Sequence, residues 1–419
     1  MAKNARDRRP AVKPVEKIEL DEKNKKLRGI LAAVFLVIGL IAIGFFIFSL
    51  LNKESGWTEI EPSGSETGAA DQFSLYYNLG ASGAAASAEY KKIAALYGEV
   101  TDKYFKLLHE DELYPGINNI AYINSRPNEE IEVLSELYEC FERLLKDKDR
   151  TLYLGALNQQ YDSLFASDDD VWAGEFDPYL NDESAAFYKT IVSFASDSEC
   201  IELLLLGENK VKLSVSESYL DFAEKNAITE FISFGNLANA FIVDEIAEAL
   251  LKEGFGLGTV SSYDGYTRNF DTSKATYSFD VWDKFEDTAY PAAVMKYEGS
   301  LAMINYRAYA ISAMDSFDYY TYRDGRIAHS YLDIGDGKYK AATDNLLVSS
   351  NDLSCAELAL KTRHIFISDD IDSEAFASIR EAGIGYVYFD GSTVHKTQDV
   401  KLEDLYSDEN VTYRISENE

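Results

Sequence analysis

The sequence predicts an α+β fold, in which antiparallel hairpins are mixed with amphipathic helices. Residues 201–206 and 210–215 are two strand-like runs joined by a Gly-Glu-Asn turn, which is the pattern of a hairpin. Helix-like segments stand between groups of strands instead of alternating with single strands, which argues against a doubly wound parallel sheet. Hydrophobic residues make up 46% of the 419 residues, a proportion typical of a chain that folds around a core.

The spacing of apolar residues predicts the other elements in chain order. Residues 73–79 suit a first strand, and residues 135–145 suit a helix. A long helix is expected between them, because apolar residues recur there at helical spacing: Tyr90, Ile93, Tyr97, Val100, Tyr104 and Leu108. Gly254 is expected to end a later helix. Further strand-like segments follow at residues 277–281, 292–297, 302–311 and 319–322.

The N-terminal part predicts a single membrane anchor. Residues 30–51 are an apolar run of 22 residues without a charge, long enough to cross a bilayer core. Residues 1–28 hold ten Lys and Arg against five Asp and Glu. The positive-inside rule therefore predicts a cytoplasmic basic tail, a transmembrane helix at residues 29–51 and a domain outside the cell membrane. Residues 52–72 are expected to be a flexible linker to a domain at residues 73–419.

Charge and cysteine content exclude several classes of partner and site. The formal net charge is −32, and such an acidic surface repels nucleic acid, so no nucleic-acid partner is expected. Cys140, Cys200 and Cys355 are odd in number and widely spaced, so they predict neither a disulfide framework nor a metal site. The hydrophobic core alone is expected to hold the domain together.

Small residues precede an amphipathic helix in the segment FGNLANAFIVD, residues 234–244. Gly235, Ala238 and Ala240 leave room for a ligand to reach backbone N–H groups at the start of the helix, where the helix dipole favours an anion. The alternative interpretation is a tight connection into the helix, which is the commoner use of glycine at such a place.

Several segments together resemble the ApbE-type FAD:protein FMN transferase family. Residues 234–244 are similar to the family's small-residue turn and helix, L-G-A-I-A-K-G-Y-A-x-D. The other similar segments are residues 113–133 (the G-I-N-N segment), 324–329 (the D-G-K-R-Y-x-H approach to the active-site histidine), 356–361 (the metal-binding helix A-D-A-L-A-T) and 365–387 (a closing strand, short helix and strand). They follow the family's order between about residues 73 and 394.

The resemblance implies a T-fold-related α+β domain of two lobes and a defined activity. That activity is the Mg²⁺-dependent transfer of FMN from FAD to Ser or Thr of extracytoplasmic, membrane-associated proteins, including subunits of membrane redox complexes. With residues 30–51 in the membrane, the chain would face such acceptors. The alternative is a catalytically inactive relative whose fold serves as a flavin-binding or protein-binding surface module.

The resemblance also implies the residues of the site. His329 would be the catalytic base, although a lone histidine after a turn is also commonly a surface or capping residue. The cofactor-binding residues would be Gly235, Ala238, Asn239, Asp244 and Asp318. Mg²⁺ would be bound by the carbonyl of Ala238 together with Glu357 and Thr362.

Two positions depart from the family pattern and put FAD and Mg²⁺ binding in question. Lys361 stands where the family has its threonine ligand, and a protonated amine offers Mg²⁺ no lone pair. Thr362 is rotated by ~100° from that position on a helix. Asn239 stands where the family has a lysine. Lys361 could instead pair with Glu357 one helical turn away, or contact FAD phosphates. We therefore expect FMN transfer to be weak or absent.

Overall fold

The structure is a computed structural model that describes Phe35 and residues 55–416, except residues 82, 84, 147, 148, 287 and 314. The chain divides into two units, Met1–Lys53 and Glu54–Glu419, and the elements below belong to the second. The predicted basic tail and transmembrane helix, residues 1–28 and 29–51, lie outside the described residues apart from Phe35. Among the described residues, no helix has both the length and the apolar character that crossing a membrane requires.

An antiparallel sheet of nine strands organises the second unit, in the order β1-β2-β6-β7-β10-β13-β14-β15-β17. Every neighbouring pair is antiparallel except β15 and β17. The strands are β1 (Gly56–Glu59), β2 (Phe73–Leu79), β6 (Leu257–Ser262), β7 (Tyr266–Asp271), β10 (Leu301–Arg307), β13 (Asn345–Ser350), β14 (Gly385–Asp390), β15 (Thr393–Lys396) and β17 (Arg414–Ile415).

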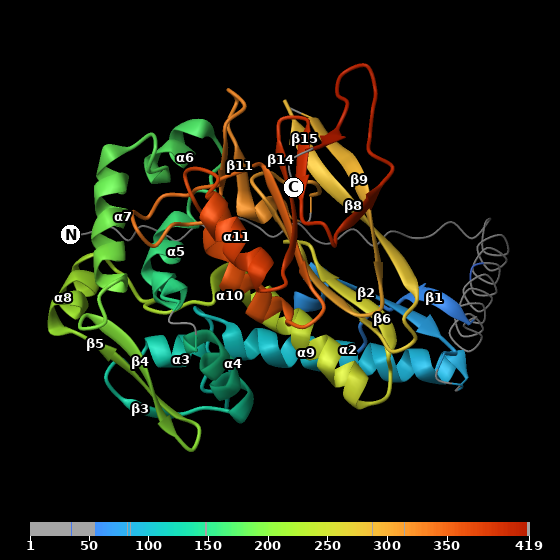
Figure 1. Ribbon diagram of the computed structural model, residues 1–419. Helices are drawn as coiled ribbons and strands as arrows, with labels where there is room; N and C mark the ends of the chain where they lie inside the picture. The colour runs from blue at the N-terminus through green and yellow to red at the C-terminus, as the bar shows by residue number, and fades with distance from the viewer. Residues whose placement is uncertain are drawn as a thin grey trace, which may run out of the picture. The chain divides into compact units, whose positions relative to one another are not determined.

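Helices cover one face of this sheet. α2 (Ala86–Leu108) and α9 (Ala238–Lys252) pack on each other, α2 against β2 and α9 against β6 and β7 (Figure 1). α10 (Cys355–Phe366) lies beside α9 on β7, β10 and β13, and α11 (Ser373–Glu381) packs on α10 and β14. Alternate residues of β10 face these helices and belong to the main core: Ala302, Ile304 and Tyr306.

A second, three-stranded sheet covers the other face. Its order is β16-β9-β8, with β8 (Thr276–Phe285), β9 (Thr288–Glu298) and β16 (Lys401–Glu403). The residues of β10 that point away from the helices, Leu301 and Met303, join its apolar side chains in a separate core cluster. All seven residues of β10 are therefore buried, because both faces of the strand are covered.

The segment between α2 and α9 is mainly helical. It contains α3 (Ile120–Asn124), β3 (Glu130–Glu132), α4 (Ser135–Leu145), η3 (Thr151–Leu154), α5 (Gly155–Tyr161), α6 (Asp170–Phe176), α7 (Asp182–Ala195), β4 (Ile201–Gly207), β5 (Lys210–Val215) and α8 (Glu217–Lys225). The strands form a small sheet in the order β3-β5-β4. Buried residues of this segment and of the large sheet belong to one core cluster, so the two expected lobes are not packed separately.

Most predicted elements are present, and the exceptions have local causes. β2 and α4 have the predicted bounds, and Gly254, with a φ of +85°, follows the end of α9. The strand expected at residues 302–311 stops at Arg307, because the chain turns there into a loop held by Asp315. Residues 365 and 366 end α10 and do not begin a strand, because the apolar face of that helix continues through them.

The expectation of a flexible linker at residues 52–72 is wrong for its described part. β1 pairs with β2, and η2 (Ala69–Gln72) leads directly into β2. Asp102 of α2 accepts hydrogen bonds from the hydroxyls of Ser65 and Thr67 at 2.7 and 2.6 Å. The Gly, Ser and Glu content that suggested a linker instead supplies the polar partners of this turn, and residues 55–72 belong to the folded domain.

Truncation of β10 tests whether both of its faces are covered. Ile304→Ala and Met303→Ala each remove a buried side chain, one from each face, so each should lower the free energy of unfolding by about 2–5 kcal/mol. Leu204→Ala on β4, where the side chain is exposed, is the matched control and should change it by less than about 0.5 kcal/mol. Urea denaturation measures all three, and a neutral Met303→Ala would show that the second face is open.

Candidate functional site

The small-residue turn forms a tight entry into α9. Gly235 has a φ of +47°, and its N–H donates to the hydroxyl of Ser233 at 2.8 Å. A Cβ atom at this position would lie 3.0 Å from the side-chain nitrogen of Asn158, so both the backbone angle and the space favour glycine. The single turn η4 (Gly235–Leu237) follows, and Ala238 is the first residue of α9.

Two asparagines of this turn contact other parts of the chain. Asn236 donates to the hydroxyl of Ser330 at 2.8 Å, directly after β12 (Ile327–His329). Asn239 donates to the carboxylate of Asp264 at 3.1 Å, in the turn between β6 and β7. β12 forms a hairpin with β11 (Tyr319–Thr321). The start of α9, the β6–β7 turn and the end of this hairpin therefore meet at one place, which we call the α9 entry site.

Carboxyl groups surround this site, and their pKa values are raised. Burial raises the pKa of Asp264 to about 7, and the negative charge of Asp318 adds to the effect. Burial also raises the pKa of Asp318 to about 6 and that of Asp162 to about 7. One oxygen of Asp264, Oδ1, is inaccessible to solvent and has no hydrogen-bond partner among the described residues. The carboxyl groups are therefore partly protonated near neutral pH.

A buried ion pair positions two loops of the site. Arg307, the last residue of β10, pairs with Asp315 at 3.0 Å, and both side chains are buried. Arg307 also donates to the carbonyl oxygen of Tyr263 at 3.0 Å. Asp315 accepts the backbone N–H of Ser312 at 2.8 Å. One guanidinium thus holds both the β6–β7 turn and the loop that leads to Asp318.

His329 ends β12 inside an aromatic surround. Its ring centroid lies 5.1 Å from that of Tyr339 and 5.6 Å from that of Tyr331, and the residue is 3% exposed. Its Nδ1 atom is buried without a hydrogen-bond partner among the described residues. Burial lowers the pKa of His329 to about 3, so the imidazole is neutral at physiological pH and is a weak base in this conformation.

Two of the three residues predicted to bind Mg²⁺, Thr362 and Glu357, are engaged within the protein. Thr362 is 0% exposed, donates its hydroxyl to the carbonyl oxygen of Leu358 at 2.8 Å and shares a hydrogen bond of 3.1 Å with the hydroxyl of Tyr306. The Glu357 carboxylate accepts the N–H of Ser354 at 3.1 Å in a capping box at the start of α10. No group of three His, Cys, Asp or Glu able to hold a metal occurs in the described residues. The predicted set does not fit Mg²⁺.

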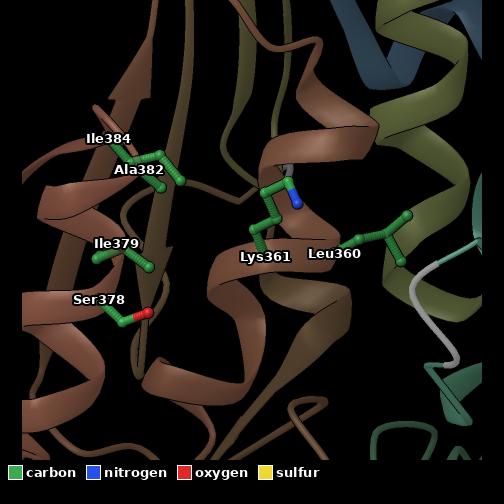
Figure 2. Close-up of a pocket in the computed structure, with 6 residues that line it drawn as sticks. All are labelled: Leu360, Lys361, Ser378, Ile379, Ala382 and Ile384. Carbon is green, nitrogen blue, oxygen red and sulfur yellow. The ribbon is translucent and has the colours of Figure 1, made fainter.

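Lys361 lies on the side of α10 that faces α11. It lines a surface hollow of about 260 Å³ together with Ser378, Ile379 and Ala382. Figure 2 shows Ser378 and Ile379 on α11 and Ala382 directly after it, all opposite Lys361, and shows Leu360 pointing from α10 in the other direction. Lys361 and Thr362 therefore face different surroundings, as expected for neighbouring helical positions that differ by ~100°.

Asp244, predicted to bind the cofactor, instead joins α9 to α10. Its two oxygens accept the N–H groups of Cys355 and Ala356 at 2.8 and 2.9 Å. Arg143 of α4 donates to the same carboxylate at 2.9 Å. These contacts confirm that the turn-and-helix segment and residues 356–361 lie together. They also leave Asp244, 3% exposed, without a free oxygen for a ligand.

Sequence reasoning missed three residues of this region: Asp162, Arg307 and Arg363. A signal was present only for Arg307, which ends an apolar strand and precedes a turn-rich loop. Asp162 follows α5 and Arg363 lies within α10, and the patterns of these two helices give no sign of a nearby site. Gly265 provides a weaker signal for the β6–β7 turn, since its φ is +109° and a Cβ atom there would overlap the carbonyl oxygen of Asn305.

Replacement of Asp244 tests its role in joining the helices. Asp244→Asn takes the carboxylate from two buried N–H groups and leaves Arg143 with Glu245 as its one remaining carboxylate partner among the described residues, so the free energy of unfolding should fall by about 3–5 kcal/mol. Asp221→Asn, at an exposed position of α8, is the control for the same chemical change and should be nearly neutral. A loss below about 1 kcal/mol in Asp244→Asn would contradict the assigned role.

The raised carboxyl pKa values predict how stability depends on pH. The pKa values of Asp264, Asp318 and Asp162 lie above the ordinary value of 3.8, so the folded state holds more protons than the unfolded state. Their stabilising effect is complete below about pH 4 and is lost as pH rises through 6–7, by up to about 1.4 kcal/mol per pH unit for each group. Thermal unfolding should therefore occur at a lower temperature at pH 8 than at pH 5.5. Asp264→Asn should reduce this difference, and an unchanged difference would contradict the assignment.

Comparison with known proteins identifies the fold. No protein-family model and no curated protein sequence matches the chain. Among solved structures, the flavin transferase ApbE from Vibrio cholerae is similar at a TM-score of 0.52 and 12% identity, over 84% of this chain and 96% of that one. The ApbE protein from Thermotoga maritima is similar at a TM-score of 0.53 and 14% identity, over 80% and 94%. The chain therefore has an ApbE-like fold.

Proposed function

We propose that this chain is a flavin-transferase-like protein that binds a flavin nucleotide but transfers FMN weakly or not at all. The observation that carries the proposal is the arrangement of Lys361 and Thr362 on α10. The side chain of Thr362 is bonded within the core, and the neighbouring position holds a cation where an oxygen ligand would be needed. An ApbE-like fold with this helix keeps the scaffold but not the predicted Mg²⁺ ligands.

The α9 entry site supplies the groups that would hold a nucleotide. The residues at the start of α9, Gly235, Asn236, Ala238 and Asn239, are partly exposed. The amides of Asn236 and Asn239, which donate to Ser330 and Asp264 in this structure, would exchange these partners for the oxygens of a phosphate group. Asp264 and Asp318 act against a phosphate group there while they are ionised. Flavin binding at this site should therefore be stronger at pH 6 than at pH 8, because the two carboxyl groups take up protons in this range.

The low pKa of His329 is a second, independent reason to expect weak transfer of FMN. A general base works best when its pKa is near the pH of the reaction. Burial keeps the pKa of His329 at about 3, and no described residue is hydrogen-bonded to its Nδ1 atom. In this state the imidazole is poorly suited to take the proton of an acceptor hydroxyl.

The test is a flavin titration followed by an acceptor assay. FAD is added to the full chain with and without Mg²⁺, and binding is followed by flavin fluorescence. The protein is then incubated with an acceptor of the ApbE type and examined for covalent flavin. We expect binding that is insensitive to Mg²⁺ and little or no labelling. Lys361→Thr, which removes the cation and returns an oxygen, should increase the sensitivity to Mg²⁺.

Two results would overturn the proposal in different ways. Mg²⁺-dependent labelling that disappears in His329→Ala would establish an active transferase. Absence of FAD binding at both pH 6 and pH 8 would leave only the fold in common with flavin transferases. Asp221→Asn, an exposed change on α8, serves as the control for handling and folding.

A protein-binding role is the second candidate, because one loop near the site exposes apolar side chains. Phe317 is 78% exposed and Ile311 is 40% exposed. Their loop is anchored by Asp315, which accepts the N–H of Ile311 at 3.1 Å and pairs with Arg307. Apolar side chains exposed next to one another on a surface often mark a protein contact.

A further inference from the structure

Arg363 on α10 is a buried cation with unsatisfied donors. The residue is 6% exposed, and its Nε and Nη1 atoms are inaccessible and have no hydrogen-bond partner among the described residues. Arginine is rarely buried without a partner, because an isolated charge away from water is strongly destabilising. The contrast within this domain is clear, since Arg143 and Arg307 each contact a carboxylate at 2.9–3.0 Å.

Arg363 lies close enough to two tyrosines of the large sheet to act on them electrostatically. α10 packs on β7 and β10, which carry Tyr266 and Tyr306. Burial raises the pKa of both tyrosines, and the positive charge of Arg363 acts on both in the opposite direction. Tyr266 directly follows the β6–β7 turn, and the negative charge of Asp264 in that turn also raises its pKa. The guanidinium therefore lies near the start of β7, the strand that follows the β6–β7 turn of the α9 entry site.

We infer that Arg363 is an oxyanion site that binds a phosphate group through its guanidinium. The planar fork of N–H donors matches the oxygens of phosphate, and binding would satisfy the two nitrogens that have no partner. Because Nε and Nη1 are inaccessible in this structure, binding requires the side chains that cover the guanidinium to move. The inference rests on the proposed function for the nature of the ligand, a flavin nucleotide. In that setting Arg363 supplies a positive charge from the same helix, α10, on which Glu357 and Thr362 are engaged within the protein.

Free phosphate is the simplest probe. The melting temperature of the full chain is measured in potassium phosphate and in potassium chloride of equal ionic strength. Saturating phosphate should raise it by about 2–4 °C in the wild-type protein. Arg323→Met, which removes an exposed arginine, should keep this rise. Arg363→Met should abolish it.

Arg363→Met in chloride gives a second, independent readout. Methionine removes the unpaired charge while filling similar space, so the variant should melt at the same temperature as the wild type or higher. A large fall in melting temperature would show that Arg363 has a partner within the protein and would overturn the inference. Phosphate stabilisation that persists in Arg363→Met, or that is missing from the wild type, would also overturn it.

A flavin series distinguishes the two sources of phosphate and separates this inference from the proposed function. FMN should bind at least about 10-fold more tightly than riboflavin, which lacks the phosphate, and Arg363→Met should remove the difference. If phosphate binds through Arg363 while no flavin binds, the proposed function fails and the oxyanion site remains. If FMN and riboflavin bind equally well to the wild type and phosphate has no effect, flavin binding stands and the oxyanion site fails.

Discussion

The carboxylate of Asp244 fixes the arrangement on which the rest of the site depends. It receives the first N–H groups of α10 and the guanidinium of Arg143, so α4, α9 and α10 meet at one buried charge. Arg143 also lies 4.7 Å from the ring centroid of Phe241, where it adds a cation–π contact to α9. Because α10 begins at this point, the positions of Thr362 and Arg363 along the helix follow from it.

Much of the fold could be predicted from local patterns. Three patterns reflect short-range preferences and are present in the structure. They are the alternation of buried and exposed residues in β2, the helical spacing of apolar residues in α2 and α4, and the glycine-containing turn before β5. Residues 55–72 could not be predicted in this way, since a Gly- and Ser-rich composition is shared by linkers and by turns. What fixes that segment is Asp102, a long-range partner more than 30 residues away.

The sequence predicted which segments of the candidate site lie together, but not what their side chains contact. The resemblance correctly brought residues 234–244 and 356–361 together, because a fold keeps its helix contacts when its site residues change. The roles of Asp244 and Thr362 depended on which atoms their side chains reach, and both reach partners within the protein. No spacing in the sequence shows that Arg363 is left without a partner, because burial and pairing arise only when distant strands pack on α10.

β10 joins the interior of the domain to the rim of the site. Its seven residues are buried between the helices and the second sheet, and it ends on Arg307, which holds two loops of the site. Strands covered on both faces usually open only when the whole domain unfolds, whereas surface loops open locally. The backbone amides of β10 should thus exchange their hydrogens most slowly. Exchange in the two loops that Arg307 contacts should be slower than in other surface loops. The two loops of the site can then open fully only when β10, the last part of the domain to open, also releases Arg307.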